Sequence, residues 1–237
     1  MSKEPHELLN GYNLSKSFDS PAGELKILKG LDFTVHQGEM AFILGRSGSG
    51  KSTLLNILGG LDQPSDGKVL FEGKDLADFN EKELAGIRNT RIGYIFQFYH
   101  LLPELTVFEN VLLPSIILGR PNHSWARECL RKVQLYSRAE HYPAELSGGE
   151  KQRAAIARAL VNQPSVVLCD EPTGNLDEDT ASGVFSLLAE LNQRDGQAFV
   201  IVTHDQPLAA SHETVYRLID GVLLPERQRP VDVERFS

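Results

Sequence analysis

The octapeptide GRSGSGKS at residues 45–52 constrains this chain more than any other stretch. It follows an uninterrupted apolar run, MAFIL at 40–44, and leads into a helical stretch, STLLNIL at 52–58. It matches the pattern G-x-x-x-x-G-K-[ST], in which glycines let backbone N–H groups surround phosphates. The alternative is a glycine turn that begins a helix, and the bare pattern arises by chance in roughly one chain in a hundred. The strand–loop–helix context favours a phosphate-binding loop.

Most residues of this loop are candidate contacts to a nucleotide. Lys51 places a positive charge beside the β- and γ-phosphates, and the Ser52 hydroxyl can bind Mg²⁺. Further contacts are expected from Gly45, Arg46, Ser47, Gly48, Ser49, Gly50 and Thr53. The loop therefore predicts a nucleotide and Mg²⁺ as ligands.

Two further apolar runs indicate the fold class. SVVLCD at 165–170 and AFVIVT at 198–203 each end in polar, turn-rich residues, and helical patterns lie between them. Such alternation is typical of a parallel α/β sheet whose strands are buried on both faces. Residues 25–44 are predicted as β segments with a turn at Gln37–Gly38, and Asp220–Gly221 predicts a hairpin near the end of the chain.

The middle of the chain has a different pattern. Residues 81–163 are mostly helical in pattern, and IGYIF at 92–96 is the one buried-strand run there. We therefore expect a single domain over 1–237 with an α/β core of the P-loop NTPase type. N-terminal antiparallel β segments and a helical subdomain, inserted at approximately 81–163, complete the expected architecture.

Polar residues at strand ends are candidates for catalysis. Asp170 ends SVVLCD at the edge where α/β sheets bind ligands, and its carboxylate can hold Mg²⁺ through water. The adjacent Glu171 can orient or deprotonate an attacking water, although the pair by itself is more typical of a helix N-cap. His204 follows AFVIVT and is predicted to contact the γ-phosphate, the alternative being a surface histidine. Gln97, just after IGYIF, can reach Mg²⁺ or the attacking water through its amide.

Composition excludes several classes of protein. The net charge of −8 and pI of about 5.4 weigh against general nucleic-acid binding, which usually leaves a basic footprint. The two cysteines, Cys129 and Cys169, suggest neither a disulfide framework nor a zinc site, so a reducing cytosol is expected. The stretch VLLPSIILG at 111–119 is too short to span a bilayer, so the chain is expected to be soluble and to reach a membrane only through a partner.

A second anion-binding pattern, ELSGGEKQR, occurs at 145–153. A serine and two glycines precede a predicted helix, and free N–H groups at a helix start favour anions. One nucleotide does not need two such sites. The nucleotide bound by the loop at 45–52 therefore does not account for the anion-binding pattern at 145–153.

The order of these motifs resembles the nucleotide-binding domain of ABC ATPases over almost the whole chain. The resemblance rests on the phosphate loop, Gln97, LSGGE at 146–150, VVLCDE at 166–171, NLD at 175–177 and His204. It implies an ATPase homodimer in which two domains pair head to tail. The γ-phosphate held by one chain would then be contacted by these residues of the other chain: Leu146, Ser147, Gly148, Gly149, Glu150 and Asp177. Phe18, in LSKSF, matches the aromatic residue that stacks on adenine.

Within that family, the sequence most resembles the LolD-type ATPases of lipoprotein-releasing complexes. The supporting stretches are LGGLDQP at 58–64, RNTRIGYIFQFYHLLPELTVFENVLLP at 88–114 and LVNQPSVVLCDEPTGNLD at 160–177. The resemblance implies a peripheral position on the cytoplasmic face of the bacterial inner membrane, with two integral membrane subunits that contact the lipoprotein substrate. Phe98, Tyr99 and His100 are the candidates for coupling to those subunits.

Other functions share parts of this pattern. MacB-type exporter ATPases and FtsE-type cell-division ATPases share much of the sequence of these stretches. DNA-repair ABC ATPases share the phosphate loop and the LSGG-type motif, but they usually carry a coiled-coil or zinc insert that this sequence lacks. A P-loop GTPase or small-molecule kinase would leave LSGGE unexplained, and no N-K-x-D guanine signature occurs.

Overall fold

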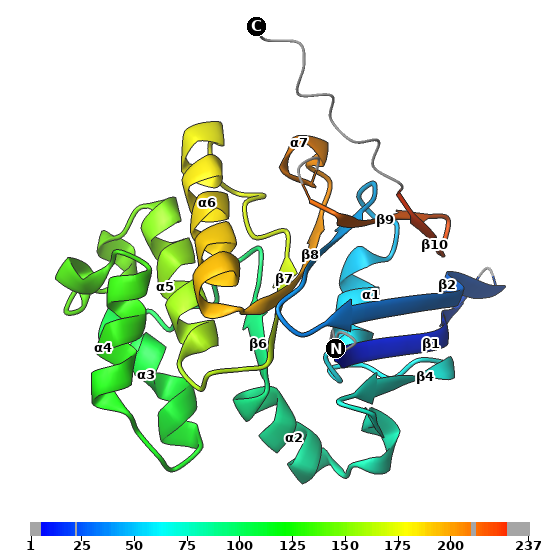
Figure 1. Cartoon of the computed structure of the whole chain (residues 1–237), viewed down its shortest axis with the longest axis horizontal. Coiled ribbons are helices and arrows are strands. Elements are labelled where there is room, and N and C mark those ends of the chain that lie inside the picture. Colours follow the sequence, from blue (N-terminus) through cyan, green and yellow to red (C-terminus); the bar gives the residue numbers. More distant parts are fainter. Residues whose placement is uncertain (1–5, 22, 210–211, 227–237) are drawn as a thin grey trace, which may run out of the picture.

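The structure is a computed structural model that describes residues 6–21, 23–209 and 212–226. A six-stranded sheet forms its centre (Figure 1), with the strand order β10-β9-β3-β8-β7-β6. All neighbouring strands pair in parallel except β9 and β10. The strands are β3 Met40–Leu44, β6 Ile92–Ile95, β7 Val166–Asp170, β8 Ala198–Thr203, β9 Thr214–Ile219 and β10 Val222–Pro225. The predicted parallel core is confirmed, because the three apolar runs form β3, β8 and β7 side by side.

The central strands separate two hydrophobic cores. Along β3, Phe42 faces the core that also contains Val111 and Leu188, whereas Ile43 faces the core that contains Leu54. All five residues of β3 and all six of β8 are buried. Since side chains alternate between the faces of a strand, burial on both faces requires a continuous apolar run. This explains why these strands were readable in the sequence.

Helices cover both faces of this sheet (Figure 1). The first core lies beneath α3, α4, α5 and α6, and α1 packs on the second core. Three helices begin with a reciprocal capping box, which satisfies two N–H groups at a helix start. The helices are α1 Lys51–Leu58, α2 Glu81–Thr90, α3 Val107–Ile117, α4 His123–Lys132, α5 Gly148–Leu160, α6 Glu178–Asp195 and α7 Gln206–Ala209, with 3₁₀ turns at Leu76–Asp78, Tyr136–Arg138 and Pro143–Glu145.

A second, antiparallel sheet has the order β2-β1-β4-β5 and covers the side of α1 away from the central sheet. Its strands are β1 Glu7–Ser20, β2 Gly23–His36, β4 Asp66–Phe71 and β5 Lys74–Asp75. The predicted turn at Gln37–Gly38 is confirmed between β2 and β3. The predicted hairpin is also confirmed, since β9 and β10 pair antiparallel around Asp220–Gly221.

Residues 81–163 contain α2, α3, α4 and α5 together with β6. Strand β6 pairs in parallel with β7, so this part of the segment belongs to the central sheet. Helices α3, α4 and α5 pack against one another on one side of the molecule (Figure 1). The subdomain boundaries at approximately 81 and 163 stay a prediction. No helix in the described ranges combines the length and apolar character needed to cross a membrane.

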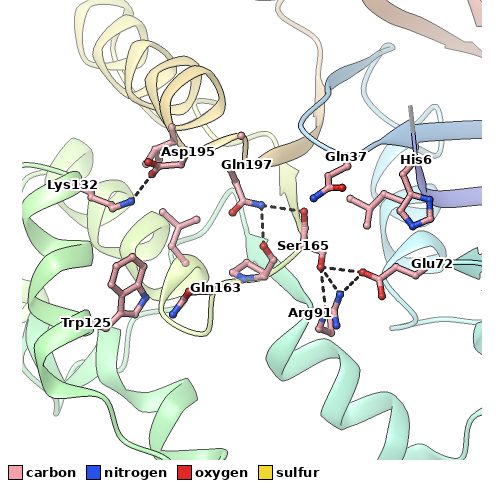
Figure 2. A pocket seen from close by; sticks show the side chains of 15 residues that line it. His6, Gln37, Glu72, Arg91, Trp125, Lys132, Gln163, Ser165, Asp195 and Gln197 are labelled. Carbon is pink, nitrogen blue, oxygen red and sulfur yellow. Dashed lines mark hydrogen bonds and ion pairs between the residues drawn. The ribbon is translucent and has the colours of Figure 1, made fainter. Parts of the chain in front are cut away.

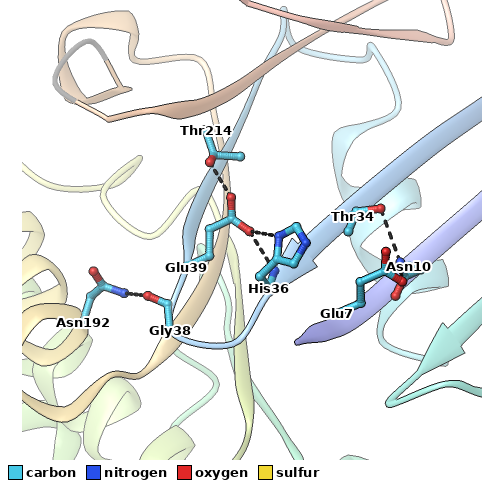
Figure 3. Close-up of polar contacts among 8 residues, drawn as sticks. All are labelled: Glu7, Asn10, Thr34, His36, Gly38, Glu39, Asn192 and Thr214. Carbon is cyan, nitrogen blue, oxygen red and sulfur yellow. Dashed lines mark hydrogen bonds and ion pairs between the residues drawn. The ribbon is translucent and has the colours of Figure 1, made fainter. Parts of the chain in front are cut away.

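A polar cluster fixes the amino end of β3 (Figure 3). The Glu39 carboxylate accepts hydrogen bonds from the His36 N–H, at 2.7 Å, and from the Thr214 hydroxyl of β9. The Asn192 amide of α6 donates to the Gly38 carbonyl at 2.8 Å. The turn before β3 is thereby tied to β9 and to α6, which sets the strand that carries the glycine loop at its other end.

Candidate active site

The glycine loop follows β3 and turns directly into α1. Gly48 and Gly50 have φ angles of 78° and 99°, a left-handed region that glycine adopts without a steric penalty. At Gly45 a Cβ atom would lie 2.6 Å from the Ser49 hydroxyl oxygen and 2.9 Å from the Leu218 carbonyl oxygen. Gly50 caps α1 without a side-chain hydrogen bond, so N–H groups of the first turn face the loop. This arrangement can bind a phosphate at the helix start.

Lys51 reaches back across the loop from the first turn of α1. Its side chain is only 6% exposed, and its ammonium donates to the carbonyls of Gly45, at 2.9 Å, and Arg46, at 3.1 Å. The same ammonium lies 3.2 Å from Oε1 of Glu171. A buried cation is tolerated only with such polar partners. The loop therefore holds one fixed positive charge at its centre.

Glu171 links the ends of three parallel strands. It follows β7 directly and has a positive φ of 46°. One oxygen pairs with Lys51, which follows β3, and the other lies 2.7 Å from Nδ1 of His204, which follows β8. Glu171 and His204, both predicted for the site, are thus brought together beside Lys51. The imidazole is 65% exposed, so it can also contact a molecule at the surface.

Ser52 and Asp170 form an oxygen pair beside Lys51. The Ser52 hydroxyl donates to Oδ1 of Asp170 at 3.0 Å. Burial raises the pKa of Asp170, an effect that the Ser52 hydrogen bond opposes, while the Glu171 charge raises it further. A hydroxyl and a carboxylate are the oxygen ligands that Mg²⁺ prefers. A cation placed here would also offset the unfavourable burial of this carboxylate.

The outer face of the loop lines a cavity of about 530 Å³. The Ser49 hydroxyl is buried and, among the described residues, has no hydrogen-bond partner. A buried hydroxyl without a partner is uncommon and indicates a group that a ligand can satisfy. The cavity is lined by predicted contacts and by residues that the sequence analysis missed: Leu44, Gly45, Arg46, Ser47, Gly48, Ser49, His204, Gln206, Arg217, Leu218, Ile219 and Asp220. Those from β9 could not be found without knowing that β9 lies next to β3.

Gln97 lies beside the loop that follows β7. Its backbone carbonyl accepts a hydrogen bond from the Asn175 amide at 2.9 Å. A Cβ atom at Gly174 would lie 3.2 Å from the Gln97 side-chain nitrogen. Gln97 is therefore held close to the segment that begins with Glu171. Thr53 lies within the first turn of α1.

The LSGGE residues form the start of α5. Ser147 is the N-cap of this helix, and its hydroxyl accepts from the Glu150 N–H at 3.2 Å. The Glu150 carboxylate accepts from the Ser147 N–H at 2.8 Å. Ser147 is exposed, Gly148 is partly exposed, and Leu146 and Gly149 are buried. At Gly149 a Cβ atom would lie 2.4 Å from Cγ2 of Thr180 in α6. Ser147 thus offers the accessible polar group of this cluster.

Asp177 stands next to this cluster, as the N-cap of α6. Its carboxylate accepts from the Thr180 N–H at 3.0 Å. Hydrogen bonding by the Thr180 side chain, and then by its N–H, lowers the pKa of Asp177. Within the described ranges, no hydrogen bond or ion pair joins this cluster to the loop at 45–53. The chain therefore presents two separate polar clusters, one at each helix start.

The remaining predicted site residues are Phe18, on β1, and residues 98–100, which follow β6. Phe18 is 45% exposed on β1, with the Lys16 ammonium 5.1 Å from its ring centroid. Phe98 is 66% exposed, and His100 packs edge-on against Phe96. Tyr99 is partly buried, and a Cβ atom at Gly148 would lie 3.1 Å from its hydroxyl oxygen. Within the part of the chain that the structure describes, no hydrogen bond or ring contact joins Phe18 to the loop.

Another cavity, of about 500 Å³, lies near the amino ends of the central strands (Figure 2). Its charged side chains are paired with one another. Lys132 lies 2.5 Å from Asp195, and Arg91 bonds both Ser165 and Glu72. Because these charged side chains are already paired with one another, a charged ligand would have to compete with the existing ion pairs in this cavity. The loop is therefore the candidate active site.

Comparisons with known proteins agree with this geometry. Residues 28–174 match the family model described as ABC transporter. The chain is 49% identical to the lipoprotein-releasing system ATP-binding protein LolD of Alcanivorax borkumensis, over 91% of this chain and 96% of that protein. It is 48% identical to the LolD of Pseudomonas syringae pv. tomato, over 92% and 97% of the two chains.

Solved structures show the same architecture. The dimeric structure of MJ0796, a bacterial ABC transporter cassette, superposes with a TM-score of 0.85 at 40% identity, covering 94% of this chain and 99% of that one. A post-hydrolysis state of the same cassette, bound to ADP and Pi, gives the same values. The fold class expected from the sequence is confirmed. The chain belongs to the ABC transporter family, as one of its ATPase cassettes.

Proposed function

We propose that this chain is the ATP-binding and ATP-hydrolysing subunit of a lipoprotein-releasing complex. The observation that carries the proposal is identity of 47–49% to four LolD proteins over 91–94% of this chain. Two copies would act with two integral membrane subunits, on the cytoplasmic face of a bacterial inner membrane. Those membrane subunits would contact the lipoprotein. Nucleic acid has no role in this proposal, in keeping with the net charge of −8.

The glycine loop would bind the phosphates of ATP. Backbone N–H groups of 45–50 and the Lys51 ammonium supply positive charge, and the Ser49 hydroxyl supplies a donor that is otherwise unpaired. Phe18 would offer a ring face to adenine. Mg²⁺, when bound by Ser52, Asp170 and Gln97, would neutralise charge on the phosphate oxygens. The Ser52–Asp170 pair fits that ion because both atoms are oxygen ligands.

Glu171 would act as the general base. Its carboxylate can accept a proton from the attacking water at Oε1 or Oε2, and His204 holds the carboxylate in place through Nδ1. The exposed side of the His204 ring would contact the γ-phosphate. Gln97, held beside the same segment, would orient the attacking water. The positive charge of Lys51 would reduce the electrostatic repulsion between the Glu171 carboxylate and the phosphates.

Pairing with a second copy would give the LSGGE motif a role. Ser147 and its neighbours, with Asp177, would complete the site of a second copy rather than that of their own chain. Each pair of chains would then hold two ATP molecules between a glycine loop and a partner's α5. The N–H groups at the start of α5 favour an anion there. The exposed Phe98, together with Tyr99 and His100, would couple the pair to the membrane subunits.

The experiment that tests this proposal compares wild type with Glu171→Gln. The glutamine keeps the shape of the side chain but cannot accept the proton, so we expect ATP binding to persist and kcat to fall by about 10²–10⁴-fold. Glu190→Gln, which removes an exposed carboxylate of α6, is the matched control and should keep its activity. Normal turnover by Glu171→Gln would contradict the role of this base.

A second arm of the experiment tests the complex itself. A tagged chain purified from its own membranes in mild detergent should recover two integral membrane subunits. Reconstituted with them in vesicles, it should release lipoproteins only with hydrolysable ATP. Recovery of an exporter's membrane subunit, or of a cell-division membrane protein, would contradict lipoprotein release while leaving the ATPase function intact.

A further inference from the structure

Arg158 is a partly buried cation of α5 that no step above uses. Its guanidinium donates from Nη2 to the Tyr99 carbonyl at 2.8 Å, and from Nη1 to the His100 carbonyl. Burial lowers the pKa of this group from its usual value, yet an arginine remains charged at neutral pH. Hydrogen bonds from a charged donor are the stronger ones, and a planar guanidinium can serve two acceptors at once.

The segment that Arg158 holds is otherwise short of backbone bonds. Residues 96–103 are in neither helix nor strand, and His100 has a positive φ of 48°. A second contact comes from the start of the same helix, where a Cβ atom at Gly148 would lie 3.1 Å from the Tyr99 hydroxyl. Arg158 therefore bonds residues 99 and 100 to the end of α5, and the Tyr99 side chain also lies close to the start of this helix. The carbonyl of Gln97, two residues earlier, is held from the other side by Asn175.

We infer that Arg158 is a positioning residue, which joins the Gln97 segment to α5 so that the two move as one unit. The inference rests on the proposed ATPase function. Gln97 serves the site of its own chain, whereas the start of α5 serves the site of a second copy. If the two segments move together, binding of ATP in the site of this chain would shift the start of α5. The start of α5 is the part that this chain contributes to the site of the second copy. This link lies in bonds to backbone carbonyls, so no side-chain pattern in residues 97–100 reveals it.

The matched control lies on the same helix. Arg153 of α5 also donates to a backbone carbonyl, that of Val133 at 3.2 Å, and is partly buried. Val133 follows α4, away from the glycine loop. Arg153→Met and Arg158→Met therefore remove the same kind of bond from the same helix. Only the second variant should release the Gln97 segment. Thermal unfolding of both variants shows whether each is folded at the assay temperature.

Two readouts separate positioning from general stability. Chymotrypsin cleavage after the exposed Phe98, followed by mass spectrometry, should be about tenfold faster in Arg158→Met than in wild type or Arg153→Met, because cleavage needs local opening. In the full-length chain, kcat for ATP should fall about tenfold or more in Arg158→Met, with the Kd for ATP within about twofold of wild type. Arg158→Lys should recover part of the loss in kcat.

Two outcomes would overturn the inference. Equal loss of kcat in both methionine variants would show a general effect on α5. Unchanged kcat in a folded Arg158→Met chain would show that the bonds do not position the site, whatever the cleavage rate. Absence of ATPase activity in wild type is a different result: it would refute the proposed function, and cleavage after Phe98 would still report on the link itself.

Discussion

Glu171 shows how one side chain can organise a site. Its two oxygens face different groups, the Lys51 ammonium and the His204 imidazole, which follow different strands. Neither neighbour is close to it in sequence, so the grouping depends on the order of the strands in the sheet. A substitution at Glu171 removes a partner from both Lys51 and His204, whereas a substitution at either neighbour leaves one Glu171 oxygen unpaired. Their effects should therefore be strongly non-additive.

His212 lies between aromatic rings rather than among charges. Its ring centroid is 4.6 Å from that of Phe42 and 5.6 Å from that of Phe185. Burial lowers its pKa below the usual value. Because the folded-state pKa is depressed, the unfolded chain binds more protons as the pH falls through about 6.5. The stability contribution present above that pH is therefore lost on acidification.

We predict a pH dependence that two substitutions at His212 remove. The midpoint of thermal unfolding, measured between about pH 7.5 and pH 5.5, should fall more steeply in wild type than in His212→Phe or His212→Gln. The phenylalanine keeps the ring contacts and the glutamine does not, so the two midpoints should differ. Both slopes should nevertheless be shallower than wild type. A wild-type slope in either variant would show that His212 is not the titrating group.

At the scale of elements, α5 and α6 begin side by side. Thr180 of α6 packs on Gly149 of α5, and the Thr180 N–H donates to the Asp177 carboxylate. A methyl group fits against a glycine where it would collide with any other residue. The second glycine of LSGGE is thus required by packing within its own chain. A charged substitution at Gly149 would therefore report on folding as well as on a partner's phosphate.

We predict that Gly149→Ala destabilises the chain and that Thr180→Ser restores it. The added Cβ would lie 2.4 Å from Cγ2 of Thr180, an overlap that costs about 1–3 kcal/mol of unfolding free energy. Serine lacks that methyl group but keeps the hydroxyl. Urea unfolding of both single variants and of the double variant measures the coupling. A double variant no more stable than Gly149→Ala would contradict this packing.

Elements were predictable where burial alone decides the pattern. Runs such as MAFIL must be apolar throughout because Phe42 and Ile43 face opposite cores. The glycine loop was predictable because Gly48 and Gly50 need positive φ angles. The strand order was not predictable, since it depends on which edges meet after folding. For that reason the lining of the cavity by Arg217 and Ile219, and the link from Arg158 to two carbonyls, appear only in the structure.

At the scale of the whole molecule, polar ties hold the layers together. Arg91, before β6, bonds Ser165, before β7, and also Glu72, after β4, so it joins the two sheets (Figure 2). Lys132 of α4 pairs with Asp195 of α6 across the same cavity. These ties lie at the amino ends of the strands. The glycine loop and Glu171 lie at the opposite ends, where they directly follow the carboxyl ends of β3 and β7. The strands fix the positions of these residues.

The last prediction tests whether one chain completes the site of another. Ser147→Asp keeps a good N-cap for α5, because aspartate caps helices about as well as serine. It adds an exposed negative charge, so we expect ATP binding by the monomer to survive and ATP-driven pairing to fail. Ser147→Asn, an equally good cap without charge, is the matched control and should pair normally. Size-exclusion chromatography with ATP measures the pairing.

Mixing Ser147→Asp chains with Lys51→Ala chains sharpens the test. Either variant alone places one defect in each composite site, so its own pairs should occlude no ATP. A mixed pair places both defects in one site and leaves the other intact, formed by the normal loop of the Ser147→Asp chain and the normal α5 of the Lys51→Ala chain. Labelled ATP, counted after rapid gel filtration, should be retained once per mixed pair. Retention of two per mixed pair, or of one by either variant alone, would contradict the head-to-tail arrangement, because a chain would then be closing its own site.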